Sequence, residues 1–291
     1  MPRPADPLAA TGPNAEQIEY WNSDAGERWA RNQDRLDAML HPFSDAMVRI
    51  AAPKTHERAL DIGCGCGATT LALDTHTGAS GRALGIDISA PMIARARERA
   101  LAAGSTAEFM LADAATHAFE PGAFDILTSR FGIMFFLEPV AAFAHMRKAL
   151  TPEGRAAFVC WRPMKENPWL SLPLFAALPH IPKPEAPEPG APGPFALGDK
   201  DRFHRILADA GYRDIGIEPF DSRLSMGRAD DPVEEALKQS LEIGPLSRIF
   251  KDLAGEQRAR VSDAVREALA AHLDDGAVVL DAAVWLVNAR A

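Results

Sequence analysis

Five short apolar runs, separated by stretches with helical periodicity, constrain the fold more than any other feature of the 291-residue sequence. Helices are expected over 67–75, 90–103 and 138–150, between the runs. Strands that alternate with helices in this way form a parallel sheet covered on both faces. The sequence therefore predicts an α/β, Rossmann-like domain. The runs are Arg58 to Ile62, Arg82 to Ile86, Ala107 to Leu111, Phe124 to Ser129 and Arg155 to Trp161.

The N-terminal fifty residues are predicted to be mostly helical. Residues 1–13 are rich in Pro and Ala and are expected to be disordered. Asn14 is expected to cap a short helix, with Gln17 as its capping-box partner. Ser23 is expected to cap a second helix that runs to about residue 39. Pro42 suits the first turn of a third helix.

The C-terminal half continues the α/β pattern after an interruption. Residues 179–194 hold so many prolines that they are predicted to form an extended, semi-rigid loop. Gly244 and Pro245 are expected to break a helix. The remaining predicted elements are helices over 201–211, 232–242 and 256–273, and strands over 214–220 and 278–287.

The composition narrows the class of protein. A formal net charge of -9 disfavours a nucleic-acid substrate, because an acidic surface repels phosphate. Three cysteines argue against a disulfide framework. No segment reads as an export signal or as a bilayer span. These features lead us to expect a cytoplasmic protein with neither a nucleic-acid nor a membrane partner; they leave the oligomeric state open.

The motif that carries the chemistry is the turn after the first strand, where Asp61 precedes three alternate glycines. Glycines let the backbone approach a ligand closely, and the following helix offers free N–H groups to an anion. The spacing Gly63-x-Gly65-x-x-Ala68 also matches a dinucleotide fingerprint, so an NAD-dependent oxidoreductase is an alternative. Asp61 favours a cationic ligand such as S-adenosylmethionine (SAM), since it would repel a pyrophosphate.

Three further polar residues follow the next three strands. Asp87 ends the second strand and is expected to accept hydrogen bonds from ribose hydroxyls. Asp113 follows the third strand, where it can accept from the adenine amino group while the N–H of Ala114 donates to the ring. Arg130 ends the fourth strand. All of them are predicted to lie at the carboxyl edge of the sheet, where open α/β sheets bind ligands.

With these residues the sequence resembles the class I SAM-dependent methyltransferases, closest to the branch that contains ubiquinone and menaquinone C-methyltransferases. The resemblance covers about residues 55–160 and implies a seven-stranded sheet whose last strand is antiparallel. It implies SAM as the cofactor and methyl transfer to a small-molecule acceptor by in-line displacement. A non-catalytic SAM-binding protein is a second alternative. The cofactor-binding residues that we expect are Asp61, Gly63, Cys64, Gly65, Asp87, Ile88, Met92, Asp113, Ala114 and Arg130.

The acceptor site is expected to lie under added lid segments. We assign residues 1–53 to a tail and lid helices, and 54–291 to the SAM-binding domain with lid insertions at about 162–200 and 222–275. Trp29, Trp161, Trp169 and Phe195 are predicted to line a mainly apolar pocket. No motif names a general base; His41, His180 and Trp161 are the candidates for a catalytic role. The single Cys64-x-Cys66 pair is not expected to bind a metal.

Overall fold

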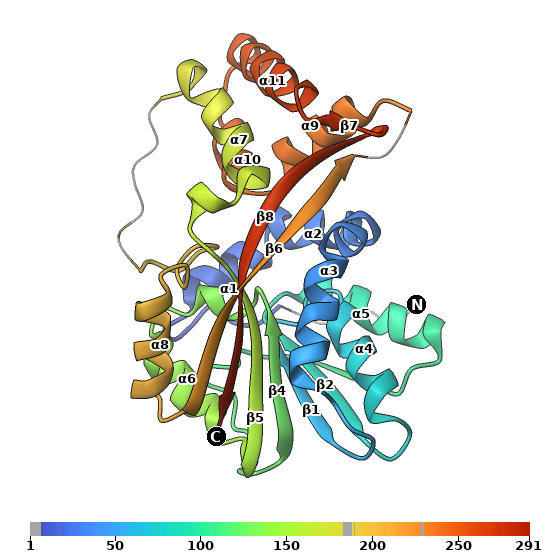
Figure 1. Ribbon diagram of the computed structural model, residues 1–291, viewed down its shortest axis with the longest axis vertical. Coiled ribbons are helices and arrows are strands. Elements are labelled where there is room, and N and C mark those ends of the chain that lie inside the picture. The colour runs from blue at the N-terminus through green and yellow to red at the C-terminus, as the bar shows by residue number, and fades with distance from the viewer. Residues whose placement is uncertain (1–6, 183–187, 189, 228–229) are drawn as a thin grey trace. The chain divides into compact units, whose positions relative to one another are not determined.

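The computed structural model describes residues 7–182, 188, 190–227 and 230–291 (Figure 1). The chain forms two compact units. The first comprises Met1–Trp161, Gly190–Pro219 and Val284–Ala291, and the second comprises Arg162–Pro189 and Phe220–Ala283. The predictions for residues 1–6 and for the prolines within 183–187 and 189 lie outside the described residues.

A mostly parallel sheet runs in the order β3-β2-β1-β4-β5-β8-β6. Strands β1 to β5 pair in parallel, and β8 pairs antiparallel to β5. The predicted Rossmann-like fold and antiparallel last strand are confirmed, but the predicted count of seven strands is wrong, because the two-residue β7 adds an eighth. The strands are β1 Arg58–Ile62, β2 Arg82–Asp87, β3 Glu108–Leu111, β4 Phe124–Arg130, β5 Leu150–Trp161, β6 Arg213–Gly227, β7 Leu273–Asp274 and β8 Ala277–Arg290.

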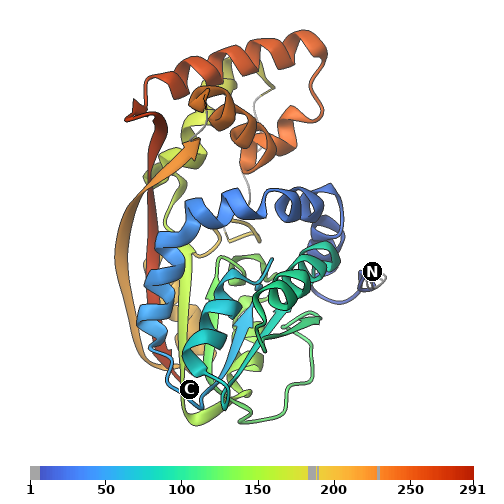
Figure 2. The ribbon, with the colours of Figure 1, turned by 90° about the vertical axis from the view of Figure 1, so that its right-hand side faces the viewer.

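Helices cover both faces of this sheet. Helices α6 and α8 lie on one side in Figure 1, and α3, α4 and α5 lie on the other, where Figure 2 shows them in front of the strands. One buried cluster joins α3 and α4 to the strands through apolar side chains such as Ala51, Ala59 and Leu73. The bounds are α3 Gln33–Ala51, α4 Ala68–Thr77, α5 Ala90–Ala103, α6 Pro139–Arg147 and α8 Lys200–Asp209.

The N-terminal helices are α1 Ala15–Trp21, α2 Asp24–Arg31 and α3. Ser23 caps α2 as predicted, accepting from the N–H of Ala25. The predicted boundaries of the next helix are wrong: α2 ends before Asn32, and α3 runs straight through Pro42. A proline inside a helix removes one hydrogen bond, but buried neighbours such as Phe43 and Met47 hold α3 against the core.

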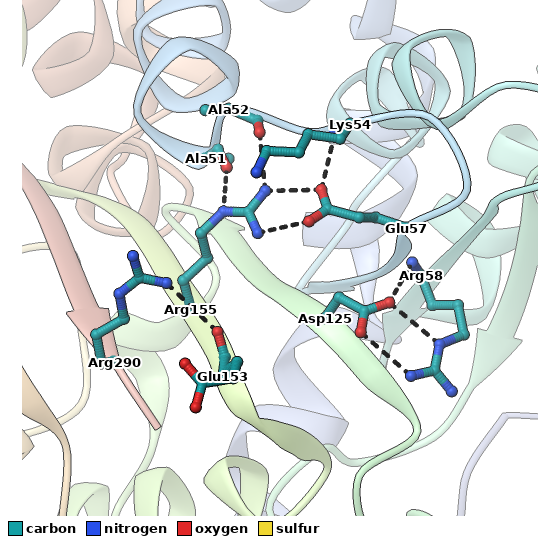
Figure 3. Close-up of polar contacts among 9 residues, drawn as sticks. All are labelled: Ala51, Ala52, Lys54, Glu57, Arg58, Asp125, Glu153, Arg155 and Arg290. Atoms are coloured by element: carbon teal, nitrogen blue, oxygen red, sulfur yellow. Dashed lines mark hydrogen bonds and ion pairs between the residues drawn. The ribbon is translucent and has the colours of Figure 1, made fainter.

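Salt bridges fix the end of the sheet opposite the carboxyl edge of β1 to β4 (Figure 3). The guanidinium of Arg155 donates to the carbonyls of Ala51 and Ala52 at the end of α3, and to both carboxylate oxygens of Glu57 at 2.7 and 2.8 Å. Arg58 pairs with Asp125 in the same way across β1 and β4. Asp125 therefore has a structural role.

The second unit is mainly helical. It contains the short helices η2 Met164–Glu166 and η3 Leu178–His180, and the longer helices α7 Pro168–Ala177, α9 Pro232–Glu242, α10 Pro245–Phe250 and α11 Gly255–Ala270. The predicted break at Gly244 and Pro245 is confirmed. Asn167 joins the start of α7 to β8, since its amide donates to and accepts from the backbone of Ala283. Within the described ranges, no helix is both long and apolar enough to cross a membrane.

Candidate active site

The glycine turn between β1 and α4 combines tight packing with one open position. All three glycines have positive φ, at 62° for Gly63, 56° for Gly65 and 84° for Gly67. A Cβ on Gly63 would lie 2.5 Å from the Cα of Gly132, and one on Gly67 would lie 2.8 Å from the ring of Phe109. At Gly65 the nearest atom would be the sulfur of Met92, at 3.9 Å. A Cβ would thus meet open space at Gly65, whereas Gly63 and Gly67 are tightly packed.

Asp61 lies next to the last residue of β1 and is fully buried. Its Oδ2 accepts from the hydroxyls of Thr69 and Thr70 at 2.6 and 2.7 Å, and its Oδ1 accepts from Thr128 at 3.1 Å. Burial raises the pKa of this carboxyl, and the three hydroxyls oppose that rise. Sequence reasoning did not foresee these donors. A contact with the SAM ammonium group stays a prediction.

Asp87 ends β2 directly beside the glycine turn. Its Oδ2 accepts from the N–H of Gly65 at 2.8 Å, and its Oδ1 accepts from the N–H of Ser89 at 2.9 Å. Burial raises its pKa to about 6, although these backbone donors favour the ionised form. Each oxygen has two lone pairs, so the carboxylate can still accept two more hydrogen bonds.

Asp113 follows β3 and lies next to Asp87 in space, because the N–H of Ala112 donates to the carbonyl of Asp87. Its Oδ1 accepts from the N–H of Ala115 at 2.9 Å. The amide of Asn14 also donates to both of its oxygens, at 3.0 Å each. The predicted capping role of Asn14 is therefore wrong: its side chain makes no cap hydrogen bond and binds Asp113 instead.

Arg130 ends β4 in a cluster of charges beside the glycine turn. It donates to the hydroxyl of Ser44 at 2.6 Å and lies 3.8 Å from the carboxylate of Asp37. Asp37 pairs more closely with Arg99, at 2.8 Å, and Arg99 also donates to the carbonyl of Cys66. Two guanidinium groups thus share the Asp37 carboxylate, and Asp61 also acts on Arg130 through its charge. Sequence reasoning missed Asp37 and Arg99, because they lie on helices far from the motif.

Aromatic side chains gather where β4 and β5 end. Phe131 has a φ of 66°, which is strained for a residue with a side chain, and its ring stacks on Trp161 at 4.0 Å. Phe43 meets Trp161 edge-on. Trp161 is 4% exposed. Strain at a strand end beside a ligand-binding turn is typical of functional sites.

The other predicted pocket residues are Trp29, Phe195 and Trp169. Trp29 packs edge-on against Trp21, whose ring also meets Phe135. Phe195 is half-buried in the first unit. Trp169 is in the second unit, where it lines a cavity of about 10 Å³, room for about one water molecule. A shared acceptor pocket stays a prediction.

The candidate catalytic histidines also lie in different units. His41 is an exposed residue of α3, 3.3 Å from Asp45. His180 ends η3 in the second unit. Burial raises the pKa of the Cys66 thiol to about 12, so this cysteine is not a nucleophile at neutral pH. Across the described part of the chain, no group of three or more His, Cys, Asp or Glu residues could hold a metal ion.

Comparison with known proteins supports the reading of this sheet edge. A family model described as "Methyltransferase domain" matches residues 59–154, which run from β1 into β5 and contain the glycine turn, Asp87, Asp113 and Arg130. Residues 59–154 therefore have the sequence pattern of a methyltransferase domain. The sequence-based prediction of this family is confirmed.

Proteins similar in sequence to this chain include methyltransferases named for small-molecule substrates. The chain is 34% identical over 138 residues to aklanonic acid methyltransferase DauC from Streptomyces sp. (strain C5), covering 47% of this chain and 63% of DauC. It is 35% identical over 108 residues to a demethylmenaquinone methyltransferase from Thermus thermophilus, covering 37% of this chain and 49% of that enzyme. The matches thus span only about half to two thirds of these relatives.

A solved structure extends the likeness in fold beyond the methyltransferase domain. The YcgJ protein from Bacillus subtilis superposes with a TM-score of 0.57 at 16% identity, covering 86% of this chain and 98% of that one. An identity this low shows a common fold and nothing more about chemistry.

Proposed function

We propose that this protein transfers the methyl group of SAM to a small-molecule acceptor. The observation that carries the proposal is the meeting of Asp87, Asp113 and Arg130 at one edge of the sheet, around the open position at Gly65. The relatives of the methyltransferase domain support a small-molecule acceptor.

Each part of the cofactor has a partner of matching chemistry. Asp87 keeps two acceptor sites for the ribose hydroxyls, and Asp113 with the N–H of Ala114 suits the adenine ring. The guanidinium groups of Arg130 and Arg99 suit the cofactor's carboxylate. The sulfur of Met92 borders the open position at Gly65, and Ile88, next to Asp87 in sequence, remains a predicted contact.

The protein contributes mainly alignment and exclusion of water. SAM supplies a methyl group on a positively charged sulfur, so the donor needs no further activation. The S–CH₃ bond breaks as the bond to the acceptor forms, and its electron pair stays on sulfur. Fixing both partners in line can supply roughly 7–11 kcal/mol of barrier reduction. Rings such as Phe131 and Trp161 can stabilise the sulfonium by a cation–π contact.

A proton must leave only if the acceptor atom carries one at neutral pH. His41 and His180 remain the candidates for its acceptor, and Trp29, Trp161, Trp169 and Phe195 remain the candidates for the pocket. His41→Gln and His180→Gln test these two residues separately. The variant of the true base should no longer show the fall in turnover rate at low pH that protonation of the base causes.

Transfer of an isotope-labelled methyl group tests the proposal. The purified protein is incubated with methyl-labelled SAM and a panel of small metabolites, and label is counted in products that pass a filter. We expect label in at least one small product, and a greatly reduced rate in Asp87→Ala. Label that is retained on macromolecules alone would contradict a small-molecule acceptor. SAM binding without any turnover would favour the non-catalytic alternative.

A further inference from the structure

The contact between Asn14 and Asp113 joins residues 99 positions apart. Asn14 is 5% exposed and Asp113 is 9% exposed, so both are buried. The amide nitrogen of Asn14 is 3.0 Å from each carboxylate oxygen, and its Oδ1 accepts from the N–H of Leu137 at 3.2 Å. Asn14 thus ties the start of α1 to the segments that follow β3 and β4.

The Asn14 amide offers Asp113 the same kind of hydrogen-bond donor as the adenine amino group of the cofactor. The amide of asparagine is a planar NH₂ group on an sp² carbon, as is the amino group of adenine. Both donate to a carboxylate, and Asp113 is the proposed acceptor for adenine. With the N–H of Ala115 also bound, three donor contacts converge on Asp113, and the Asn14 amide occupies an acceptor position on each of its two oxygens.

The end of α1 is attached independently of Asn14. The amide of Asn22 donates to the carbonyl of Ile88 at 2.8 Å and accepts from the N–H of Ala90 at 2.9 Å. The hydroxyl of Ser89 donates to the carbonyl of Trp21 at 2.7 Å. Asn14 can therefore leave Asp113 while the other end of this short helix keeps its place.

The arrangement of α1 also leaves one polar group unsatisfied. The Oε1 of Gln17, one turn after Asn14, is buried and has no hydrogen-bond partner among the described residues. A buried acceptor without a donor is costly. This cost favours a rearrangement of α1 when a ligand enters.

We propose that Asn14 is a built-in competitor of adenine for Asp113. Entry of the cofactor displaces the Asn14 amide, and residues 7–14 are released as SAM binds. Asn14 then lowers the apparent affinity for SAM by holding part of the population in the occluded form. This inference rests on the proposed role of Asp113 in adenine binding.

Calorimetry on two variants tests the competition. Asn14→Ala removes the competing amide, and Asn14→Asp replaces it with a carboxylate that Asp113 repels. We expect both to bind SAM about three- to tenfold more tightly than the wild type. Unchanged or weaker binding in both would overturn the proposal, because a residue that positions Asp113 for the cofactor would have that effect.

Asn22→Ala is the matched control, since it loosens α1 without touching Asp113. It should not tighten SAM binding. If it tightened binding as much as Asn14→Ala, general loosening of the helix would explain the result and the competition would be refuted.

Amide hydrogen exchange provides a second test, in which ligand binding should speed exchange instead of slowing it. Adding the product S-adenosylhomocysteine should speed amide exchange in residues 8–14 and at Leu137, whereas a lid that closes on the ligand would slow it. Slower exchange there would contradict release of the segment.

Asp113→Ala separates this inference from the proposed site. If it leaves the SAM affinity unchanged, the adenine assignment itself fails. If it weakens binding but Asn14→Ala does not tighten it, only the competition fails. In the Asp113→Ala background, Asn14→Ala should have no effect on SAM affinity.

Discussion

At the scale of single residues, Asp87 links the geometry of the site to a dependence on pH. Its pKa is raised to about 6 by burial. The ionised form is the better acceptor for ribose hydroxyls. SAM affinity should therefore fall by about tenfold between pH 7 and pH 5 as this carboxyl takes up a proton. Titration calorimetry over this range measures the change.

Asp87→Asn provides the control, because the amide does not titrate. Its SAM affinity should be low at pH 7 and nearly constant down to pH 5. Acid unfolding through Asp87 does not explain the loss of SAM affinity in the wild type. The folded-state pKa of Asp87 lies above the ordinary 3.8, so protonation of this carboxyl between pH 6 and 4 favours the folded form. A variant with the wild-type pH profile would assign the titration to another group.

The cofactor residues were predictable from sequence where they follow strands. Asp87, Asp113 and Arg130 could be placed at one edge because parallel strands share the direction of their carboxyl ends. Their neighbours could not be placed, because such contacts depend on tertiary packing. Asn14 resembled a helix cap in sequence, and only the fold brings Asp113 within 3.0 Å of it.

At the scale of elements, the glycine turn contains one glycine beside open space, Gly65, and one that is tightly packed, Gly63. Gly65→Ala should cost about 1–2 kcal/mol of folding free energy for its left-handed backbone, and it should weaken SAM binding at least tenfold because its methyl group enters the open space. Gly63→Ala has the same backbone strain and also collides with the backbone of Gly132. It should cost about 2–5 kcal/mol.

Denaturant unfolding and SAM titration of these two variants distinguish the roles. Folded Gly65→Ala protein with wild-type SAM affinity would show that the space beside Gly65 is not used by the cofactor.

The Arg155 contacts make a second prediction at this scale. Arg155 and Glu57 are each 18% exposed, and Arg155 also binds two carbonyls at the end of α3. Arg155→Met removes the donor from both carbonyls and leaves the Glu57 carboxylate with only the N–H of Lys54, so it should destabilise the protein by about 2–4 kcal/mol. Arg82→Met breaks an exposed pair with Glu108 and should cost less than about 1 kcal/mol. Urea unfolding compares the two.

The loss of stability in Arg155→Met should also depend on pH. Arg155 lowers the pKa of Glu57 below 4.5 by hydrogen bonding, although burial opposes the shift. A lowered carboxyl pKa contributes stability above the ordinary pKa, and this stability is lost as pH falls through the folded-state value. The difference between wild type and Arg155→Met should shrink below pH 4.5. A difference that is constant with pH would mean that the carbonyl contacts carry the whole effect.

Element types were predictable further than element boundaries. Each of the first five apolar runs forms a strand of the expected sheet, because an alternation of strands and helices is compatible with few other folds. Pro42 was expected to begin a helix but lies inside α3, since burial of Phe43 and Met47 outweighs the local preference of proline. Helix α7 was not predicted, because its prolines resemble those of the loop that follows.

At the scale of the whole molecule, the proposed cofactor site lies in one compact unit, whereas the acceptor stays unidentified. The residues proposed to hold SAM all belong to the first unit. Those expected to surround the acceptor are divided between two units, with Trp29, Trp161 and Phe195 in the first and Trp169 in the second. The motifs after successive strands predict the cofactor, whereas no local pattern encodes the acceptor.

The most direct test of the central claim is calorimetric titration of the purified protein with SAM and, separately, with NADH. The account predicts saturable binding of SAM, no binding of NADH, and a loss of about 1.5–3 kcal/mol of SAM binding free energy in Asp87→Ala. Tight binding of NADH without binding of SAM would contradict it.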